Sequence, residues 1–351
     1  MKGRGSVGRL AAVFLTSLAV LAVFADFFSS QPFDDQSLDR ALMPPTRWHV
    51  VDGSGKLHLR PFVYRQILED PLDALYREDT SERFPLRFFA RGYRYSILGV
   101  FPASLHLVTA GDVPVLLLGA DELGRDVWAR TLAGARTSLM VVATGLSICV
   151  AVGMLVGSAA GAGSPWLDSL LMRATEFALA LPSLYLILAI RAALPAKLAA
   201  WNALLLTAAV IAGVTWPPIA KGIRGLVLQL RNSAFVEAAR ALGCSEARLW
   251  RVHLLPALLP HAAAQATVIA PAFLLGEVVL SFLDVGLSDP APSWGAMLRS
   301  LTNLRVLTDF QWNMAPLAFV FATLLSLNLL RSGRIGRGAR QGLGPAAEPQ
   351  V

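Results

Sequence analysis

Residues Ser233–Pro260 read SAFVEAARALGCSEARLWRVHLLPALLP and decide the fold, because they form a polar stretch of helical pattern between two long apolar runs. Four apolar residues recur at helical spacing in its first half, namely Phe235, Ala238, Ala239 and Leu242. Gly243 is expected to end this helix, and Ser245 to cap a second one that Pro256 limits, since a proline ring clashes with the preceding turn. The pattern predicts a helix, a glycine bend and a helix, which present a compact apolar surface suited to a groove on a partner protein.

Six residues of this stretch keep the spacing of the EAA signature of binding-protein-dependent ABC importer permeases: Glu237, Ala238, Ala239, Gly243, Leu255 and Pro256. The stretch therefore resembles the coupling loop of that family, although His253 and Ala257 stand where the family usually has Ile and Asn. The resemblance implies a cytoplasmic loop over 221–260 that docks on an ATPase subunit. The alternative is an ordinary amphipathic loop of another membrane protein.

The composition indicates an integral membrane protein. Of the 351 residues, 55% are hydrophobic and 16% charged, and the mean hydropathy is +0.54, which is too apolar for a soluble protein of this length. The net charge of +7 does not indicate nucleic-acid binding, because the basic residues lie beside apolar runs instead of forming one patch. Cys149 lies within an apolar run and Cys244 lies in the polar stretch described above, so neither cysteine predicts a disulfide or a metal site.

The apolar runs predict six transmembrane helices, at about 10–28, 138–162, 177–194, 203–220, 262–283 and 312–330. Lys and Arg precede the first run, follow the fourth and follow the last, so both termini and the Ser233–Pro260 stretch are expected in the cytoplasm. A cleaved signal peptide is the alternative for the first run, but Asp26, Phe27 and Phe28 do not make a small-residue cleavage site. The predicted divisions are 1–28, 29–137, 138–335 and a cytoplasmic tail at 336–351.

The segment 29–137 contains no apolar run long enough to span and is expected outside the cytoplasm as a small folded insert. Trp48–Val51 and Leu57–Leu59 flank a four-residue turn, Asp52–Gly55, which predicts a hairpin. Aromatic residues supply area for a small core, or for a surface that receives a substrate-delivering protein: Phe62, Tyr64, Phe84, Phe88, Phe89, Tyr93 and Tyr95.

Two further stretches resemble dipeptide and oligopeptide permeases. Residues 118–136, LGADELGRDVWARTLAGAR, are similar to LGTDxLGRDVxSRxLxGAR, and residues 280–298, LSFLDVGLSDPAPSWGAML, to LSFLGLGxxPPxPSWGxML, with Asp284 and Asp289 as departures. The first is expected to be an interfacial helix with one charged side: Asp121, Glu122, Arg125, Asp126 and Arg130. The second is expected to be a loop or re-entrant turn that seals the outer mouth.

Some residues within the spans carry their own expectations. Small residues in the second span should allow close helix packing: Gly145, Ser147, Gly153, Gly157 and Ser158. Pro182 is expected to bend the third span. Glu277 should face the bundle interior or water, because a charged side chain at a helix centre costs about 2.5 to 3.5 kcal/mol on insertion scales.

No motif in the sequence predicts an enzyme. There is no GxxxxGK[ST], HExxH or GxSxG, and the five histidines have no ligand spacing, so we assign no catalytic, cofactor or metal residue. The resemblance then implies that ATP and Mg²⁺ bind to separate ATPase subunits.

Together these observations predict an all-α polytopic protein of the type I ABC importer permease fold in a bacterial inner membrane. The resemblance implies an importer of peptides or similar small solutes, with two ATPase subunits, a second homologous permease subunit and an extracytoplasmic binding protein as partners, all assembled on the lipid bilayer without nucleic acid. Two alternatives remain at this point. One is an ion-coupled secondary transporter or channel centred on Glu277, and the other is a membrane-anchored binding or assembly module in which the insert carries the function.

Overall fold

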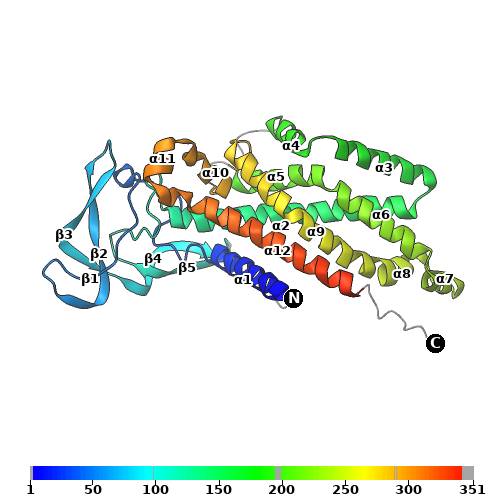
Figure 1. Cartoon of the computed structure of the whole chain (residues 1–351), viewed down its shortest axis with the longest axis horizontal. Helices are drawn as coiled ribbons and strands as arrows, with labels where there is room; N and C mark the ends of the chain where they lie inside the picture. The colour runs from blue at the N-terminus through cyan, green and yellow to red at the C-terminus, as the bar shows by residue number, and fades with distance from the viewer. Residues whose placement is uncertain (1–2, 98, 194–198, 288, 290, 342–351) are drawn as a thin grey trace. The chain divides into compact units, whose positions relative to one another are not determined.

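The computed structural model describes residues 3–97, 99–193, 199–287, 289 and 291–341, so the end of the predicted third span and most of the predicted tail lie outside them. The chain divides into two compact units, whose elements are labelled in Figure 1. The helical unit comprises Met1–Ala12, Met140–Leu280 and Leu324–Val351, and the mixed unit comprises Val13–Leu139 and Ser281–Thr323. Four helices contribute residues to both units: α1 (Gly3–Val23), α2 (Val127–Ala162), α9 (Leu255–Phe282) and α12 (Ala315–Gln341).

The helical unit is built around close packing of α2. Glycines of α2 lie against neighbouring helices, so that a Cβ atom on Gly153 would meet the side chain of Ile219 at 2.6 Å and one on Gly157 would meet the backbone oxygen of Ala220 at 2.5 Å. Gly145 lies equally close to α9, whereas Ser147 is exposed. The prediction of a closely packed second span is thus confirmed for its glycines and wrong for Ser147.

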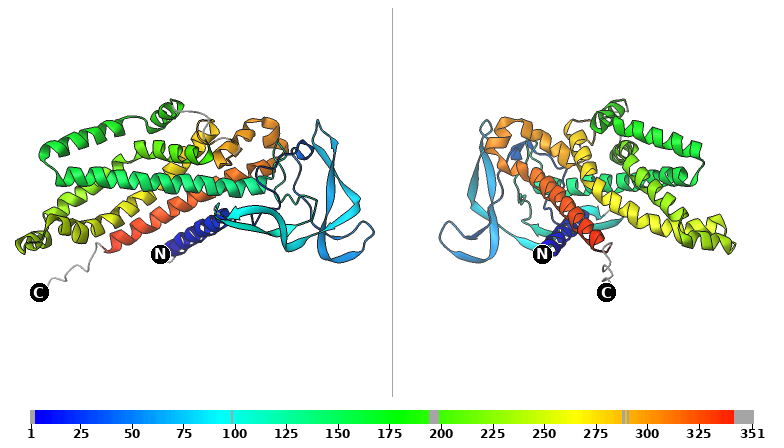
Figure 2. Two further views of the ribbon diagram at one scale, coloured as in Figure 1. Left: turned by 180° about the vertical axis from the view of Figure 1, so that it is seen from behind. Right: turned by 45° about the vertical axis from the view of Figure 1, so that its right-hand side comes forward.

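The other helices of this unit are α3 (Pro165–Ala180), α4 (Ser183–Ala192), α5 (Ala200–Thr215) and α6 (Pro217–Arg231). Ser164 caps α3 by accepting from the amide of Leu167. The helix α3 packs on α6, where Arg224 donates to both carboxylate oxygens of Asp168, at 2.5 and 2.6 Å. Figure 2 shows the same helices from two further directions.

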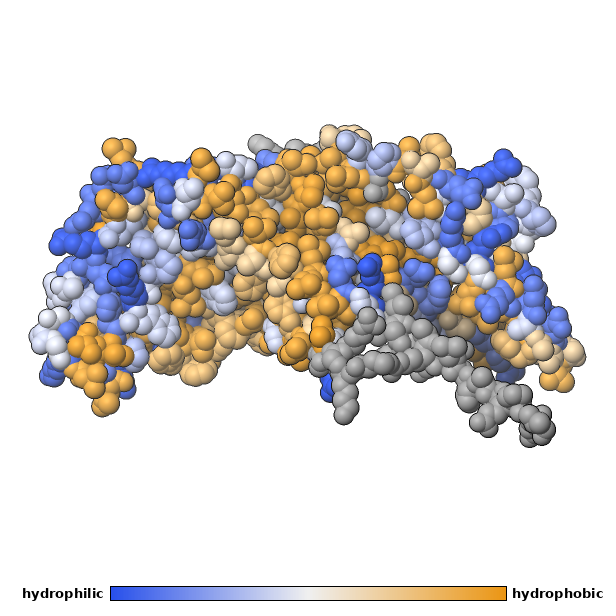
Figure 3. Space-filling view, in the orientation of Figure 1, coloured by the Kyte–Doolittle hydropathy of each residue, from blue (hydrophilic) through white to orange (hydrophobic). Residues whose placement is uncertain are grey.

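Prolines divide two of the predicted spans. The third span is interrupted at Leu181 and Pro182, between α3 and α4, and the fourth is bent by 52° at Trp216, between α5 and α6. The missing N–H and the ring of a proline account for both interruptions. Among the described residues, three helices are long and apolar enough to cross a membrane, or five if each bent pair counts once, and α1 supplies a shorter apolar helix at Val7–Val23. Figure 3 shows hydrophobic residues over much of the helical surface.

The mixed unit contains two antiparallel sheets, so the expectation of an all-α chain is wrong for the insert. One sheet has the order β1 (His49–Val51), β2 (Leu57–Asp70) and β3 (Leu75–Pro85), and the other pairs β4 (Arg87–Ile97) with β5 (Phe101–Thr109). Its apolar core includes Val63, Leu86, Val113 and Val115.

The predicted hairpin is present. Val51 pairs with Leu57 across the turn, and the carboxylate of Asp52 accepts from the amides of Ser54 and Lys56, both at 3.0 Å. Hydrogen bonds from the Ser54 hydroxyl and from His58 lower the pKa of Asp52. The predicted aromatic core is only partly correct, because Phe62 and Tyr64 are buried whereas Phe88 and Phe89 are exposed.

The prediction of an interfacial helix over 118–136 is wrong for residues 118–126, which are not helical. Residues 118–126 form turns closed by a bridge between Ala120 and Asp126, and α2 begins only at Val127. Gly124 has φ +70°, and a Cβ atom there would lie 1.9 Å from the backbone oxygen of Ser37. A helix cannot adopt this backbone, and therefore the charged residues Asp121, Glu122 and Arg125 lie on a loop.

After α9 the chain forms turns, as predicted for 280–298, and then enters α10 (Trp294–Leu298). Ser293 caps this helix by accepting from the amide of Ala296 at 3.1 Å. Asp284 has φ +62°, a conformation that suits glycine better. The last short α-helix of the mixed unit, α11 (Leu304–Asp309), precedes α12.

Candidate functional site

The predicted helix, glycine bend and helix are present in the stretch that we call the coupling segment, residues 233–255. The helix α7 (Ala234–Ala241) ends before Gly243, which has φ +77°, and α8 (Glu246–Leu249) follows. The amide of Cys244 donates to the oxygen of Ala239 at 3.0 Å and thereby closes the bend. Because nothing lies within 4 Å of the place of a Cβ on Gly243, only its backbone conformation demands glycine there.

A small apolar cluster holds the coupling segment together. Val236, Leu249 and Leu254 are fully buried, and Ala239 and Trp250 pack against them. Their contacts join α7 to the turns after the bend. The only charged link found here among the described residues is an ion pair at 2.8 Å between Arg240 and Glu246, whose side chains are 34% and 62% exposed. The segment thus has a core of its own.

The exposed surface of the coupling segment is partly apolar. Leu242 is 88% exposed and Phe235 is 47% exposed, so these two residues lie on the surface, as the predicted apolar surface requires. The buried residue on α7 is Val236, which the spacing argument missed; a single β-branched residue gives no sequence signal that separates it from its neighbours. Glu237 and Ala238 are exposed as well.

Of the six residues carried over from the EAA signature, five lie within the coupling segment and Pro256 directly follows it. Four lie on α7 or in the bend, and two, Leu255 and Pro256, lie at the start of α9. The prediction that Pro256 limits the second helix is wrong, because a π-helical turn at Trp250–Leu254 precedes the proline. The amide of Leu255 donates to the oxygen of Trp250, five residues back, and this wider turn accommodates the proline in a helix that continues to Phe282.

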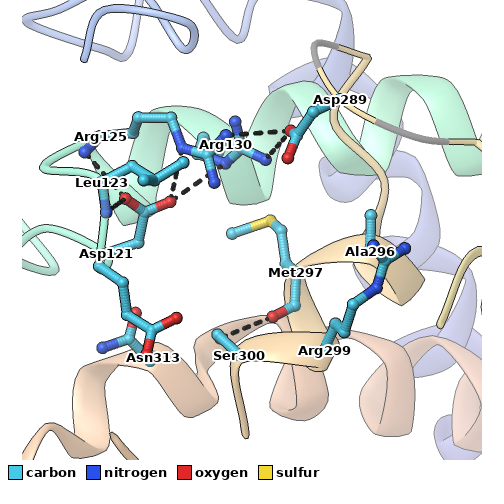
Figure 4. A pocket seen from close by; sticks show the side chains of 11 residues that line it. Asp121, Leu123, Arg125, Arg130, Asp289, Ala296, Met297, Arg299, Ser300 and Asn313 are labelled. Atoms are coloured by element: carbon cyan, nitrogen blue, oxygen red, sulfur yellow. Dashed lines mark hydrogen bonds and ion pairs between the residues drawn. The ribbon is translucent and has the colours of Figure 1, made fainter. Parts of the chain in front are cut away.

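The mixed unit contains a second group of functional candidates, which we call the charge cluster: Asp121, Arg125, Arg130 and Asp289. Asp121 Oδ2 lies 2.7 Å from Arg125 Nε and 3.7 Å from Arg130 Nε, while Asp289 Oδ1 lies 3.0 Å from Arg125 Nη1 and 2.9 Å from Arg130 Nη2 (Figure 4). The Arg130 side chain is only 2% exposed. The four charges border a cavity of about 400 Å³, which Met297, Arg299 and Asn313 also line.

Asp289 joins two stretches that lie far apart in the sequence. Burial alone would raise the pKa of Asp289, but the guanidinium groups of Arg130 and Arg125 hold it below its usual value, so the carboxylate stays charged. Asp289 is one of the departures from the family pattern at 280–298. The only sequence signal for this contact was that departure, and its partner could not be named without the structure.

Asp126 follows Arg125 of the charge cluster in the sequence and is buried, but it caps a helix instead of pairing with an arginine. Its Oδ1 caps α2 by accepting from the amides of Trp128 at 2.8 Å and Ala129 at 3.2 Å. Burial nevertheless raises the pKa of Asp126 to about 7. The hydrogen bonds of the cap favour the charged form of Asp126, and burial opposes it.

Glu277 on α9 is fully buried, which confirms that it faces away from lipid. The described residues include no group of three or more His, Cys, Asp or Glu side chains that could hold a metal ion. Neither the coupling segment nor the charge cluster places a nucleophile beside a base, and their geometry is that of contact surfaces and clamps.

Comparison with known proteins assigns the family. Residues 150–333, a little over half of the chain, match the family described as binding-protein-dependent transport system inner membrane component. The chain belongs to this family. The match contains the whole coupling segment and Glu277, and the family is one of transport permeases, not of enzymes.

Individual relatives in this family extend the match beyond that range. A Brucella ovis protein, named provisionally as a peptide permease protein, is 34% identical over 231 residues, which are 66% of this chain and 73% of that protein. The oligopeptide transport system permease protein OppC of Bacillus subtilis is 31% identical over 65% of this chain and 70% of its own. The dipeptide transport system permease protein DppC of the same organism is 33% identical over 61% and 65%.

Proposed function

We propose that this chain is the transmembrane permease subunit of an ATP-driven importer for peptides or similar small solutes, which an extracytoplasmic binding protein delivers. The observation that carries the proposal is the coupling segment, because its own core leaves Phe235, Leu242 and Glu237 free on the surface. Apolar side chains exposed on a compact helical unit are typical of a docking surface. The names of the relatives supply the substrate class.

The proposed topology has six spans with both termini in the cytoplasm of a bacterial inner membrane. The helices α1, α2, α9 and α12 would each cross once, and the bent pairs α3–α4 and α5–α6 would provide the third and fourth spans. Each crossing reverses the side of the membrane, so the coupling segment falls inside and the 29–137 insert outside. The lysines and arginines that border the coupling segment support this orientation.

The proposed complex contains two ATPase subunits, a second homologous permease subunit and the binding protein. ATP and Mg²⁺ would bind to the ATPase subunits, and closure of these subunits would pull two coupling segments together. The spans would then rock from an inward-facing to an outward-facing arrangement, a two-state motion that ligands bias. Glu237 would supply a polar contact to the ATPase, Ala238 would allow close approach, and Gly243 would set the angle of the bend.

The remaining residues of the signature would transmit this movement. Ala239 packs on the cluster that joins the two helices, and Leu255 and Pro256 begin the span that leads away from them. Because α8, the π-helical turn and α9 follow one another without a break, a displacement of the bend acts directly on the end of α9.

The test replaces an exposed apolar residue in the coupling segment with a charged one. Leu242→Asp should abolish co-purification of the ATPase subunits with the tagged chain and abolish uptake, with unchanged membrane insertion and thermal stability, because no buried contact is lost. Leu72→Asp is the matched control, since Leu72 is 82% exposed in the insert. Normal ATPase recovery and uptake by the Leu242→Asp variant would refute the docking role.

A further inference from the structure

Strand β4 carries three exposed arginines without a counter-ion. Among the described residues, no carboxylate pairs with Arg87, Arg91 or Arg94, and their side chains form no hydrogen bond there. Eight arginines of the mixed unit do have carboxylate partners, namely Arg40, Arg77, Arg83, Arg125, Arg130, Arg136, Arg299 and Arg305, whereas no ion pair among the described residues includes Arg47, Arg60 or Arg65. The positive charge on β4 is therefore available to an external anion.

Two of these arginines line a cavity. It has a volume of about 480 Å³ and is bordered by Arg87 and Arg91 together with Ser30, Gln31, Tyr93 and Thr109. No Asp or Glu belongs to its described lining. Two guanidinium groups with nothing to neutralise them favour a ligand that carries negative charge, and the planar donor fork of arginine fits a phosphate group in particular.

Hydrogen bonds attach β5, the partner strand of β4, to the turns that directly follow α1. The amide of Leu107 donates to the oxygen of Phe27 at 2.8 Å, and His106 Nδ1 lies 2.9 Å from the oxygen of Asp26 and 2.8 Å from that of Ser29. Figures 1 and 2 show the two strands beside this end of the helix. In the proposed topology, on which this inference rests, α1 crosses outward, so the cavity lies at the level of the outer headgroups.

Strand β4 also carries two exposed aromatic side chains. Phe88 is 49% exposed, and its ring centroid lies 6.4 Å from that of Trp48. Phe89 is 64% exposed, and its ring centroid lies 6.2 Å from that of Phe27. Phe89 also has φ +50°, a costly conformation for a bulky residue. A strained backbone that only exposed the Phe89 ring to water would bring no gain, whereas phenylalanine rings are stabilised when they enter the boundary between headgroups and acyl chains.

We propose that β4 lies on the outer leaflet and that Arg87 and Arg91 bind the phosphate of an anionic phospholipid headgroup in this cavity. Phe88 and Phe89 enter the boundary between headgroups and acyl chains. The lipid thereby fixes the height of the insert over the membrane. The exposed phenylalanines on the same strand and the attachment of the sheet to the chain after α1 favour a lipid over an acidic segment of a protein, which would not require exposed phenylalanines.

The test titrates short-chain phosphatidylglycerol into the full chain, purified in a neutral detergent, and counts bound lipid by native mass spectrometry. Removal of both charges in Arg87→Gln/Arg91→Gln should weaken binding about 30-fold, if each arginine contributes as basic residues do near an anionic membrane. Arg47→Gln/Arg60→Gln is the matched control, because both arginines are exposed in the insert and have no carboxylate partner among the described residues. The control should bind as the native chain does.

Each other result has a definite meaning. Equal binding by the two double variants would overturn the proposal, and so would displacement of the lipid by inorganic phosphate at equal concentration, which would indicate a site for a soluble anion. Loss of the binding protein from detergent complexes of Arg87→Gln/Arg91→Gln, with lipid binding intact, would assign the arginines to a protein contact instead. Recovery of the ATPase subunits from the same preparation tests the importer function separately.

Discussion

The coupling segment and the charge cluster distribute apolar and charged groups in opposite ways. In the coupling segment, Val236 and Leu249 are buried and the Arg240–Glu246 pair is exposed. In the charge cluster, Arg130 is buried and forms ion pairs with Asp121, which is 12% exposed, and with Asp289, which is 53% exposed. The first region also draws its core from neighbours in the sequence, whereas the second joins residues that lie about 160 positions apart.

This difference separates a surface for a partner from an internal clamp. Charges that satisfy one another inside the chain are unavailable to another subunit, and removal of one of them leaves the others uncompensated. Exposed apolar groups over a self-sufficient core remain available and cost little when changed. We therefore expect substitutions in the charge cluster to lower stability first and transport second, and surface substitutions in the coupling segment to impair transport alone.

The largest effect is expected from Arg130→Met. Methionine occupies a similar volume but leaves Asp121 and Asp289 with Arg125 as their shared partner. Loss of one member of a buried ionic network typically costs about 3 to 5 kcal/mol. The midpoint of thermal unfolding in detergent, followed by tryptophan fluorescence, should fall clearly below that of the native chain.

The control for this variant is Arg60→Met, which removes an exposed arginine that has no carboxylate partner among the described residues. Its unfolding midpoint should stay within error of the native value. If both variants unfolded alike, the charge cluster would not be a clamp and the contrast with the coupling segment would disappear.

A smaller and more local effect is expected from Val236→Ala. The substitution removes two buried methyl groups from the core of the coupling segment, at a cost of about 2 kcal/mol. Amide hydrogen exchange over residues 233–255 should accelerate, because local opening no longer has to break the full cluster. Val252→Ala, at a position 56% exposed in the same segment, should leave exchange unchanged. Acceleration that spread over the whole chain would show that this core is not independent.

Asp126 gives a prediction for pH. Burial raises its pKa to about 7, so between about pH 4 and 7 the folded chain holds a proton that the unfolded chain has lost. Stability should therefore decrease as the pH rises through this range and level off above it. Asp126→Asn keeps an oxygen that can cap α2 without the charge, and should raise stability at pH 8 by about 1 to 2 kcal/mol while changing little at pH 5. An equal effect at both values would mean that the charge of Asp126 is not the cause.

The sequence predicted the regions that are organised locally. Helix, bend and helix follow from the spacing around Gly243, and the hairpin at Asp52 follows from its turn residues, since each needs only a few neighbouring positions. The charged residues at 118–126 show the opposite case. Their spacing fits a helix, but the backbone of Gly124 packs against Ser37, some 90 positions earlier, and no local pattern contains that contact.

The same limit applies to side-chain orientation within correctly predicted elements. The spacing identified α7 and its exposed apolar residues Phe235 and Leu242, but it missed Val236, which is buried by Leu249 and Leu254 from beyond the bend. Asp289 departs from the family pattern, but no local pattern identifies its partners Arg125 and Arg130, which lie about 160 positions earlier in the sequence.

The smallest effect is expected from Glu246→Gln. The side chains of Arg240 and Glu246 are 34% and 62% exposed, and an exposed ion pair contributes little to stability because water and salt already screen it. Hydrogen exchange over residues 233–255 should match that of the native chain at 0.5 M salt and differ only slightly at low salt. A large acceleration at both salt concentrations would mean that the ion pair, and not the cluster around Val236, holds the bend closed. The coupling segment would then depend on charge as the charge cluster does, and the distinction between a free surface and a clamp would have to rest on exposure alone.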